Sequence, residues 1–331
     1  MKKNEPVTFR AACAIEADYV YVAAKPDALH SEEDFTRLFF YDAQNRATPW
    51  LHHDLPDWKV ASMCVLAKQT TTPRMYAALS EQGDIEFTWP GGRSVESIAG
   101  AGLRMSAPPI FGYVNSIKEI AGELYVCGSG GQVYRRMEGA WTHIAESLKA
   151  PATAPQSGAF TVDKDFGKHQ FSDIDGYDSS DLYVVGGDGD VFHYNGQAWS
   201  RCETPTDEIL LTVICSAKKE VWVAGFNGTL LCGNIDDGFT EFSNYDDNMI
   251  ISSIALCDST PYLATNEGLF YFDRTQRRIR SVETKLQPEI TDANVVATRD
   301  GVLWSLGYKD IAYFDGKTWT RVDHPDNPPI R

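Results

Sequence analysis

Short apolar runs recur along the chain, and several of them end on a glycine that is followed three positions later by a second glycine. The clearest runs are residues 124–128, 182–186 and 221–225, and each has an aromatic residue three positions before its final glycine. Apolar runs of this length, bounded by turn residues, are typical of buried β-strands. Because the pattern returns after a fixed interval, it predicts stacked copies of one supersecondary unit.

The interval between the aromatic positions indicates the kind of unit. Tyr183, Trp222, Tyr262 and Trp304 are separated by 39, 40 and 42 residues, which is the length of one four-stranded propeller blade. Looser matches earlier in the chain extend the series to seven anchors, namely Tyr21, Tyr76, Tyr125, Tyr183, Trp222, Tyr262 and Trp304. The sequence therefore predicts an all-β fold, a seven-bladed β-propeller of four-stranded antiparallel blades. Six blades plus an N-terminal cap of about sixty residues is the alternative.

One repeat predicts the strands of a blade in detail. Its four strands, from the axis outward, are expected at residues 171–175, 182–186, 190–194 and 198–202, with an Asn195-Gly196 hairpin before the last. The first copy begins with its own inner strand and the last ends with its own outer strand, so no blade is shared between the termini. We expect a single domain over residues 1–331, with approximate blades at 7–54, 60–100, 113–147, 171–203, 209–244, 249–284 and 291–323.

Charge and cysteine usage narrow the class of partner. The net charge is −16 and the pI is near 4.8, which argues against nucleic acid and anionic membranes and favours a basic protein surface. No apolar stretch approaches a membrane span, so we expect a cytoplasmic protein that is monomeric when free. Seven cysteines without a C-x-x-C pair indicate neither a disulfide framework nor a zinc ribbon. Four of them are expected on innermost strands: Cys13, Cys64, Cys215 and Cys257.

The repeat also resembles a known family. Residues 175–186, with Gly189, the segment 193–196 and Trp199, are similar to bacterial propeller repeats of photosystem II assembly factors and of sialidase-type (BNR-like) proteins. The similarity extends over roughly residues 113–322. It implies a propeller architecture and no particular function, because that family has many functions. Blades one and two and the long inserts depart from it, so no functional residue is transferred.

Patterns that carry catalytic or metal chemistry are weak. The seven histidines show no H-x-x-x-H spacing, which excludes a helix-borne zinc site. The carboxylates of residues 173–178 are spaced like a calcium loop but lack its glycine and its final glutamate. The glycine-rich segment 128–131 joins two strands and is expected to be a hairpin. We therefore expect no metal site, no cofactor and no assignable catalytic residue.

Long loops and acidic residues are expected on one face. In an up-and-down blade, the second-to-third strand loops and the crossovers between blades share a face, and the long segments 25–36, 101–112 and 146–170 all belong to it. Loops of this face hold 22 of the 46 acidic residues and 8 of the 30 basic ones. The rest of the chain is nearly neutral. Long irregular loops on a rigid scaffold are where binding usually occurs.

The candidate binding residues are the carboxylates and aromatic side chains of these loops. The candidates are Glu32, Glu33, Asp34, Phe35, Phe111, Phe160, Asp163, Asp165, Phe166, Asp207, Glu208, Asp246 and Asp247. Negative loops raise encounter rates with a basic partner, and apolar anchors supply most of the affinity. The resulting hypothesis is a non-catalytic module that binds a basic protein, such as an inhibitor or immunity protein that neutralises a toxin. The alternatives are a hydrolase or lyase using carboxylates or a metal at the channel mouth, and an assembly or scaffold factor.

Overall fold

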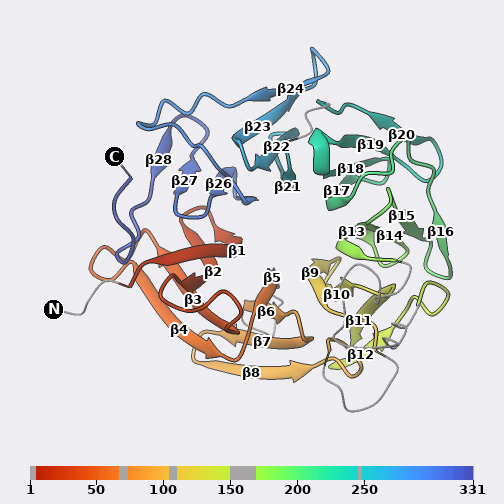
Figure 1. Cartoon of the computed structure of the whole chain (residues 1–331), viewed down its shortest axis with the longest axis horizontal. Helices are drawn as coiled ribbons and strands as arrows, with labels where there is room; N and C mark the ends of the chain where they lie inside the picture. Colours follow the sequence, from red (N-terminus) through yellow and green to blue (C-terminus); the bar gives the residue numbers. More distant parts are fainter. Residues whose placement is uncertain (1–4, 67–73, 104–109, 150–168, 245–247, 331) are drawn as a thin grey trace. The chain divides into compact units, whose positions relative to one another are not determined.

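The computed structural model describes residues 5–66, 74–103, 110–149, 169–244 and 248–330. In this part of the chain the backbone forms seven four-stranded antiparallel sheets and the short 3-10 turn η1 (Phe226–Gly228). The strands of every sheet are consecutive in the chain and pair in sequence order, which is the topology of a propeller blade. The protein is a seven-bladed β-propeller (Figure 1). As predicted, no blade is shared between the first and last segments of the chain.

The chain divides into two compact units, and the first contains residues 1–60, 226–229 and 242–331. It holds the first blade and the last two. Their strands are β1 (Val7–Glu16), β2 (Tyr19–Pro26), β3 (Phe35–Asp42), β4 (Trp50–Pro56), β21 (Ile251–Cys257), β22 (Thr260–Thr265), β23 (Gly268–Asp273), β24 (Arg278–Ser281), β25 (Val295–Arg299), β26 (Val302–Leu306), β27 (Ile311–Phe314) and β28 (Trp319–Arg321).

The second unit contains residues 61–225 and 230–241 and holds the four remaining blades. Their strands are β5 (Val60–Leu66), β6 (Met75–Ser80), β7 (Asp84–Trp89), β8 (Gly92–Ser97), β9 (Val114–Ile120), β10 (Glu123–Gly128), β11 (Gln132–Met137), β12 (Ala140–His143), β13 (Phe171–Asp178), β14 (Asp181–Gly186), β15 (Val191–Tyr194), β16 (Trp199–Arg201), β17 (Leu210–Ala217), β18 (Glu220–Gly225), β19 (Leu230–Asn234) and β20 (Gly238–Glu241).

The recurring aromatic residue fills the centre of its blade. All seven anchors lie in the second strand of a sheet, and Tyr21, Tyr125 and Trp304 are completely buried. The strands predicted from the clearest repeat are confirmed, because β13 to β16 begin and end within three residues of the expected positions. Burial of this large aromatic side chain stabilises six of the blades in the same way, whereas Tyr262 of blade six is half-buried.

The two glycines of the motif are required where crossover backbone passes the blade. A Cβ on Gly186 would lie 2.0 Å from the carbonyl oxygen of Gln170, in the segment that enters the same blade. A Cβ on Gly189 would lie 2.0 Å from the carbonyl oxygen of Thr206, in the segment that leaves it. Contacts this short exclude every side chain. The aromatic-x-x-Gly-x-x-Gly pattern is therefore a consequence of how successive blades are connected.

Residues 7–56 form a complete blade, so the alternative of six blades plus a cap is wrong. In the first unit this blade packs directly against the last one. Val7 and Phe9 of β1 share a buried cluster with Trp304 and Ile311. The sequence pattern of the early strands was weaker because they depart from the glycine pattern, although β2 is an almost continuously buried run like the second strands of the other blades.

The four cysteines that were expected on innermost strands do lie there. Cys13, Cys64, Cys215 and Cys257 lie in β1, β5, β17 and β21, and all seven cysteines are free thiols. Burial raises the pKa of Cys13 to about 12, although Arg299 lowers it slightly. A thiol with so high a pKa is unreactive near neutral pH.

Candidate protein-binding surface

In the first unit, hydrogen bonds show that the loops predicted to share a face lie side by side. The β2–β3 loop and the β26–β27 loop are joined by an ion pair between Asp27 and Lys309, and the Lys309 ammonium also donates to the Val7 carbonyl over 2.8 Å. In the β26–β27 loop, the Tyr308 amide donates to Oδ2 of Asp292 in the β24–β25 crossover over 2.6 Å. Second-to-third strand loops and a crossover therefore share one side of this unit, as strand parity predicts.

The second unit follows the same rule. The Gly131 amide, in the β10–β11 loop, donates to the His169 carbonyl over 2.9 Å, and the Gly189 amide, in the β14–β15 loop, donates to the Glu208 carbonyl over 3.0 Å. Both acceptors belong to crossovers between blades. The expected arrangement of loops is therefore confirmed within each unit.

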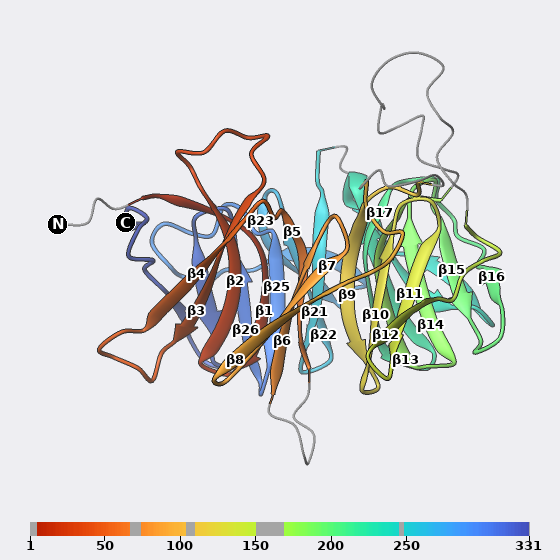
Figure 2. The same ribbon diagram turned by 90° about the horizontal axis from the view of Figure 1, so that it is seen from below.

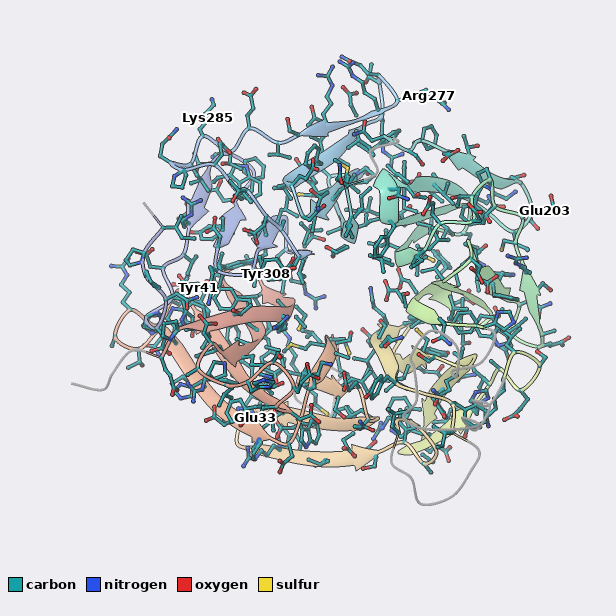
Figure 3. All side chains as sticks on the ribbon, viewed as in Figure 1. Glu33, Tyr41, Glu203, Arg277, Lys285 and Tyr308 are labelled. Atoms are coloured by element: carbon teal, nitrogen blue, oxygen red, sulfur yellow. The ribbon has the colours of Figure 1, made fainter. Side chains whose placement is uncertain are left out.

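The β2–β3 loop of the first unit presents three consecutive carboxylates. Glu32, Glu33 and Asp34 are all exposed, and the loop extends past the strand ends of its blade (Figure 2). The Lys25 ammonium holds the loop from inside by donating to the carbonyls of Ser31, over 2.9 Å, and Glu33. Glu33 and Asp34 form no ion pair with the described residues, and Figure 3 labels Glu33 on this loop. The carboxylates are thus available to a cationic partner.

A second acidic segment lies in the crossover between β16 and β17. Asp207 is exposed, and the Thr206 hydroxyl accepts a hydrogen bond from the Glu208 amide over 3.1 Å, which fixes the turn. The next residue, Ile209, is 45% exposed although it is large and apolar. This combination of an exposed carboxylate and an exposed aliphatic side chain is suited to a protein contact.

Other carboxylates of the face have structural roles. Asp190 is buried beside Nδ1 of His169, at 2.7 Å, and an Arg201 nitrogen at 2.9 Å. Asp310 is buried and accepts two hydrogen bonds of 2.8 Å from Arg321. Because these acids are neutralised inside the fold, the excess negative charge offered to a partner comes from the exposed loops.

The predicted apolar anchors are less exposed than the carboxylates. Phe35 is half-buried at the start of β3, and Phe111 is only 5% exposed, with the Lys149 ammonium 4.7 Å from its ring centre. Six candidates lie outside the described residues, namely Phe160, Asp163, Asp165, Phe166, Asp246 and Asp247.

Two exposed apolar residues on these loops were missed from the sequence. Tyr308, labelled in Figure 3, is 49% exposed in the β26–β27 loop, and Ile209 lies in the crossover described above. The sequence did contain a sign that Tyr308 is unusual. The corresponding loop of the clearest repeat, residues 186–190, contains only glycine and aspartate. A tyrosine that replaces such residues has no role in the turn itself.

The inner strands of the second unit carry a polar cluster around the buried Asp173, where the alternative of an enzyme would place its chemistry. Asp173 of β13 accepts hydrogen bonds from the Ser116 hydroxyl of β9, over 2.6 Å, and from the Val213 amide of β17, over 3.0 Å. Lys118 lies 3.8 Å from Asp173, and Asp175 accepts from the Cys215 amide over 2.7 Å. The cluster thus links three blades through groups that are already hydrogen-bonded.

The charged groups of this cluster shift one another's pKa values. Burial raises the pKa of Asp175, and the ammonium of Lys118 opposes that rise only in part. Burial alone would lower the pKa of Lys118, but the carboxylates of Asp173 and Asp175 outweigh it and raise the value. Lys118 therefore stays charged, and its main effect is to stabilise contacts between blades. Among the residues described, no group of three or more His, Cys, Asp and Glu side chains could hold a metal ion.

Comparison with known proteins shows a relative that aligns along almost the whole chain. The chain resembles an immune protein. It is 26% identical over 334 residues to "Immune protein Tsi7" of Pseudomonas aeruginosa, and the alignment covers 98% of this chain and 100% of that protein. No protein-family model matches.

Solved structures with the same fold are remote in sequence. The WD40 β-propeller domain of Doa1 has a TM-score of 0.62 and 10% identity, covering 94% of this chain and 93% of that one. PorZ of Porphyromonas gingivalis, a bacterial surface component of a type-IX secretion system, has a TM-score of 0.60 and 13% identity, covering 96% of this chain and 38% of PorZ. These similarities show the propeller fold alone. In the described part of the chain, no helix is long and apolar enough to cross a membrane.

Proposed function

We propose that this chain is a non-catalytic immunity protein that neutralises a toxin by binding to it. The observation that carries the proposal is the similarity to a protein named as an immune protein, which extends over both chains almost completely. A full-length match is informative because the propeller fold of this chain by itself imposes no function. The resemblance of the repeats to photosystem II assembly factors and sialidase-type proteins concerns architecture only, and we assign no function from it.

The exposed acidic loops are the proposed docking elements. In the first unit these are Glu32, Glu33 and Asp34, with Phe35 at their base and Tyr308 nearby along the same side of the blades. In the second unit they are Asp207 and Glu208, followed by the exposed Ile209, and Phe111 in the crossover before β9. The carboxylates would attract a basic toxin surface over about 10 Å at moderate salt, and the apolar residues would contribute after contact. Phe160, Asp163, Asp165, Phe166, Asp246 and Asp247 belong to the same proposal.

The proposed role also sets our expectations for the cellular compartment and the oligomeric state of the protein. We expect the protein to act in the cytoplasm as a monomer that forms a one-to-one complex with its toxin. The acidic charge of the chain suits a cationic partner and disfavours binding to nucleic acid.

A charge-reversal experiment tests the proposal. The triple variant Glu32→Lys, Glu33→Lys, Asp34→Lys is compared with a control of equal charge change in loops at the other ends of the strands: Asp18→Lys, Asp236→Lys, Asp237→Lys. The toxin is captured from the native cell on the immobilised protein at low salt and quantified. We expect the loop variant to lose at least tenfold in affinity and the control to keep it. Equal binding by both variants would refute the assignment of the loops, and failure of the unaltered protein to capture or protect against any toxin would refute the immunity role.

A further inference from the structure

The outer hairpin of the sixth blade is strongly basic, in contrast to the rest of this acidic chain. Arg274, Arg277, Arg278 and Arg280 fall within seven residues of the β23–β24 hairpin. Figure 3 labels Arg277 at the tip of this hairpin. Because the chain carries a net charge of −16, four arginines in one short segment are a local reversal of its electrostatic character.

Comparison of the blades shows that the fold does not require an arginine at position 280. In blade six, Tyr262, Tyr271 and Arg280 lie opposite one another across three neighbouring strands. The residues that occupy the position of Arg280 in four other blades are small and neutral, namely Thr142, Ser200, Thr240 and Thr320. An arginine at a position where the repeat accepts a small hydroxyl residue needs an explanation other than packing.

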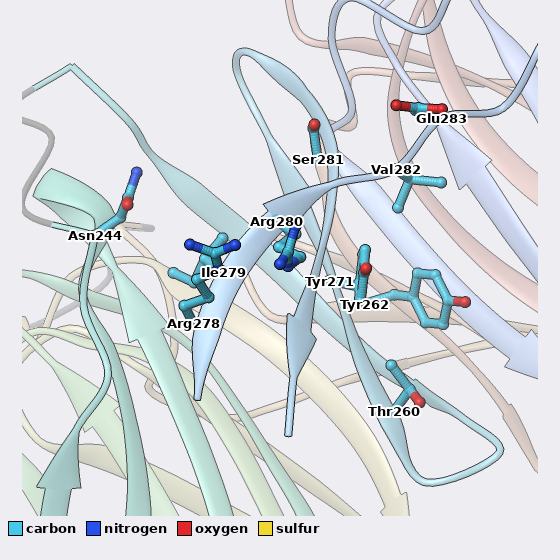
Figure 4. Close-up of a pocket in the computed structure, with 10 residues that line it drawn as sticks. All are labelled: Asn244, Thr260, Tyr262, Tyr271, Arg278, Ile279, Arg280, Ser281, Val282 and Glu283. Carbon is cyan, nitrogen blue, oxygen red and sulfur yellow. The ribbon is translucent and has the colours of Figure 1, made fainter. Parts of the chain in front are cut away.

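The arginines border a groove. A cavity of about 760 Å³ is lined by Tyr262 and Tyr271 together with Arg278 and Arg280 of the outer strand, and Figure 4 shows Arg280 beside the two tyrosines. The tyrosine ring centres are 6.2 Å apart. Glu283, at the rim, is the single acidic residue among those lining the groove. Tyrosine next to arginine is a combination enriched in binding sites.

Neighbouring groups hold the arginines in position but leave charge unsatisfied. Arg280 lies 3.2 Å from a carboxylate oxygen of Asp273, and the Arg277 guanidinium is 4.9 Å from the ring centre of Phe242. The Arg278 side chain is exposed and makes no ion pair or hydrogen bond at contact distance with the described residues, although its charge helps to lower the pKa of Asp273 on the neighbouring strand. One carboxylate therefore lies beside Arg278 and Arg280, which leaves an excess of positive charge facing the groove.

The geometry of the strand indicates the shape of the ligand. Arg278 and Arg280 are two residues apart on β24, so their side chains leave the same face at a spacing of about 7 Å. Alternate side chains of an extended peptide have the same spacing. Arginine binds carboxylates through two parallel hydrogen bonds, and β24 is the outermost strand of its sheet.

We propose that the groove on blade six binds an extended acidic segment of a protein, with carboxylates at alternate positions contacting Arg278 and Arg280. A nucleic acid would carry the same sign of charge as the chain as a whole and would be repelled by it, whereas a short acidic segment presents its charge locally. This inference does not rest on the proposed immunity role, because none of the proposed docking residues lines the groove.

Fluorescence anisotropy with a labelled peptide of alternating glutamate and threonine tests the site on the full chain at low salt. The variant Arg278→Gln, Arg280→Gln should bind at least tenfold more weakly than the unaltered protein. Arg93→Gln is the matched control, because Arg93 occupies the position of Arg280 in blade two and lies 3.7 Å from Glu86. It should leave the affinity unchanged, and thermal melting should show all variants folded.

Three results would overturn the proposal. The first is equal peptide affinity for the double variant and the unaltered protein. The second is an equal loss in Arg93→Gln, which would indicate general attraction rather than a site. The third is tighter binding of a single-stranded oligonucleotide of the same length and charge than of the peptide, which would identify a phosphate-binding surface instead.

Discussion

Individual side chains explain why two blades carry a glutamate two residues before the aromatic anchor. The Tyr125 hydroxyl donates to Glu123 over 2.7 Å, and the Trp222 indole nitrogen donates to Glu220 over 2.8 Å. Alternate residues of a strand point to the same face, so an acid at this spacing is placed to accept the polar hydrogen of the buried ring. This feature could be derived from the sequence once the strand was assigned.

Asp173 is the residue whose loss should destabilise the second unit most. Asp173→Ala removes the acceptor of the Ser116 hydroxyl and the Val213 amide and leaves Lys118 with less compensation. We expect a loss of roughly 2–4 kcal/mol in the free energy of unfolding, measured by urea denaturation. The exposed Asp236→Ala should change it by less than about 0.5 kcal/mol. Similar midpoints for the two variants would contradict the structural role given to the cluster.

His324 should make the protein sensitive to acid. Burial, with the positive charges of His52, Arg37 and Lys309, lowers its pKa from 6.5 to about 4. The unfolded chain therefore binds a proton below pH 6.5 that the folded chain takes up only near pH 4. This contribution to stability is complete above pH 6.5 and is lost as the pH falls toward 4, by up to about 3 kcal/mol.

The variant His324→Asn tests that prediction. Asparagine can replace Nδ1 as the acceptor of the Asp326 amide, a contact of 3.2 Å, but it does not titrate. Unfolding free energies are measured in urea at pH 7.5 and pH 4.5. The variant should be less stable than the unaltered protein at pH 7.5 and lose less on acidification. An identical pH dependence in the two proteins would exclude His324 as the sensitive group.

At the scale of elements, the segment after β28 fastens the first and last blades of the first unit. Asn327 accepts a hydrogen bond from the Val7 amide over 2.8 Å, and the Trp50 indole donates to the Asp323 carbonyl over 3.3 Å. The His324 ring lies 4.5 Å from the rings of both Phe39 and Trp50, centre to centre. A segment without regular structure therefore contributes to the core.

Removing this segment should cost substantial stability. A chain that ends at Arg321 loses Val322, His324 and Asn327, all of them buried. We expect a decrease of about 3–5 kcal/mol in unfolding free energy, because apolar contacts and hydrogen bonds are lost together. A chain that ends at Pro328 keeps these contacts and should resemble the full protein. Equal stability of the two truncated chains would show that the segment is not part of the core.

The strands and hairpins were the elements best predicted from the sequence. The Asn195-Gly196 turn and the glycines beside the crossovers carry local conformational information, so β13 to β16 were placed closely. The first blade was harder, because its β2–β3 loop replaces the short glycine turn by residues 27–34. Long loops contain little information about their own path, since their conformation depends on distant contacts such as that of Asp27 with Lys309.

For the whole molecule, charge should control how quickly the proposed toxin is captured. Raising sodium chloride from about 0.05 M to about 0.5 M shortens the screening length from roughly 14 Å to 4 Å. We expect the association rate constant to fall about tenfold or more while the dissociation rate changes little, measured by surface plasmon resonance. An association rate that is independent of salt would contradict steering by the acidic loops.

The sequence by itself determined the blade length and the identity of the buried anchors, because these follow from local periodicity and from glycines that only a close backbone approach requires. It left a choice between seven blades and six blades plus a cap, which the pairing of β1 to β4 decided. Strand parity also determined which loops share a side. Only the tertiary structure decided which charges remain available. It paired Asp190 and Asp310 inside the fold, left Glu33 and Asp34 exposed, buried Phe111 and exposed Tyr308. Pairing and burial depend on residues far apart in the chain, and a pattern along the sequence does not contain those distances.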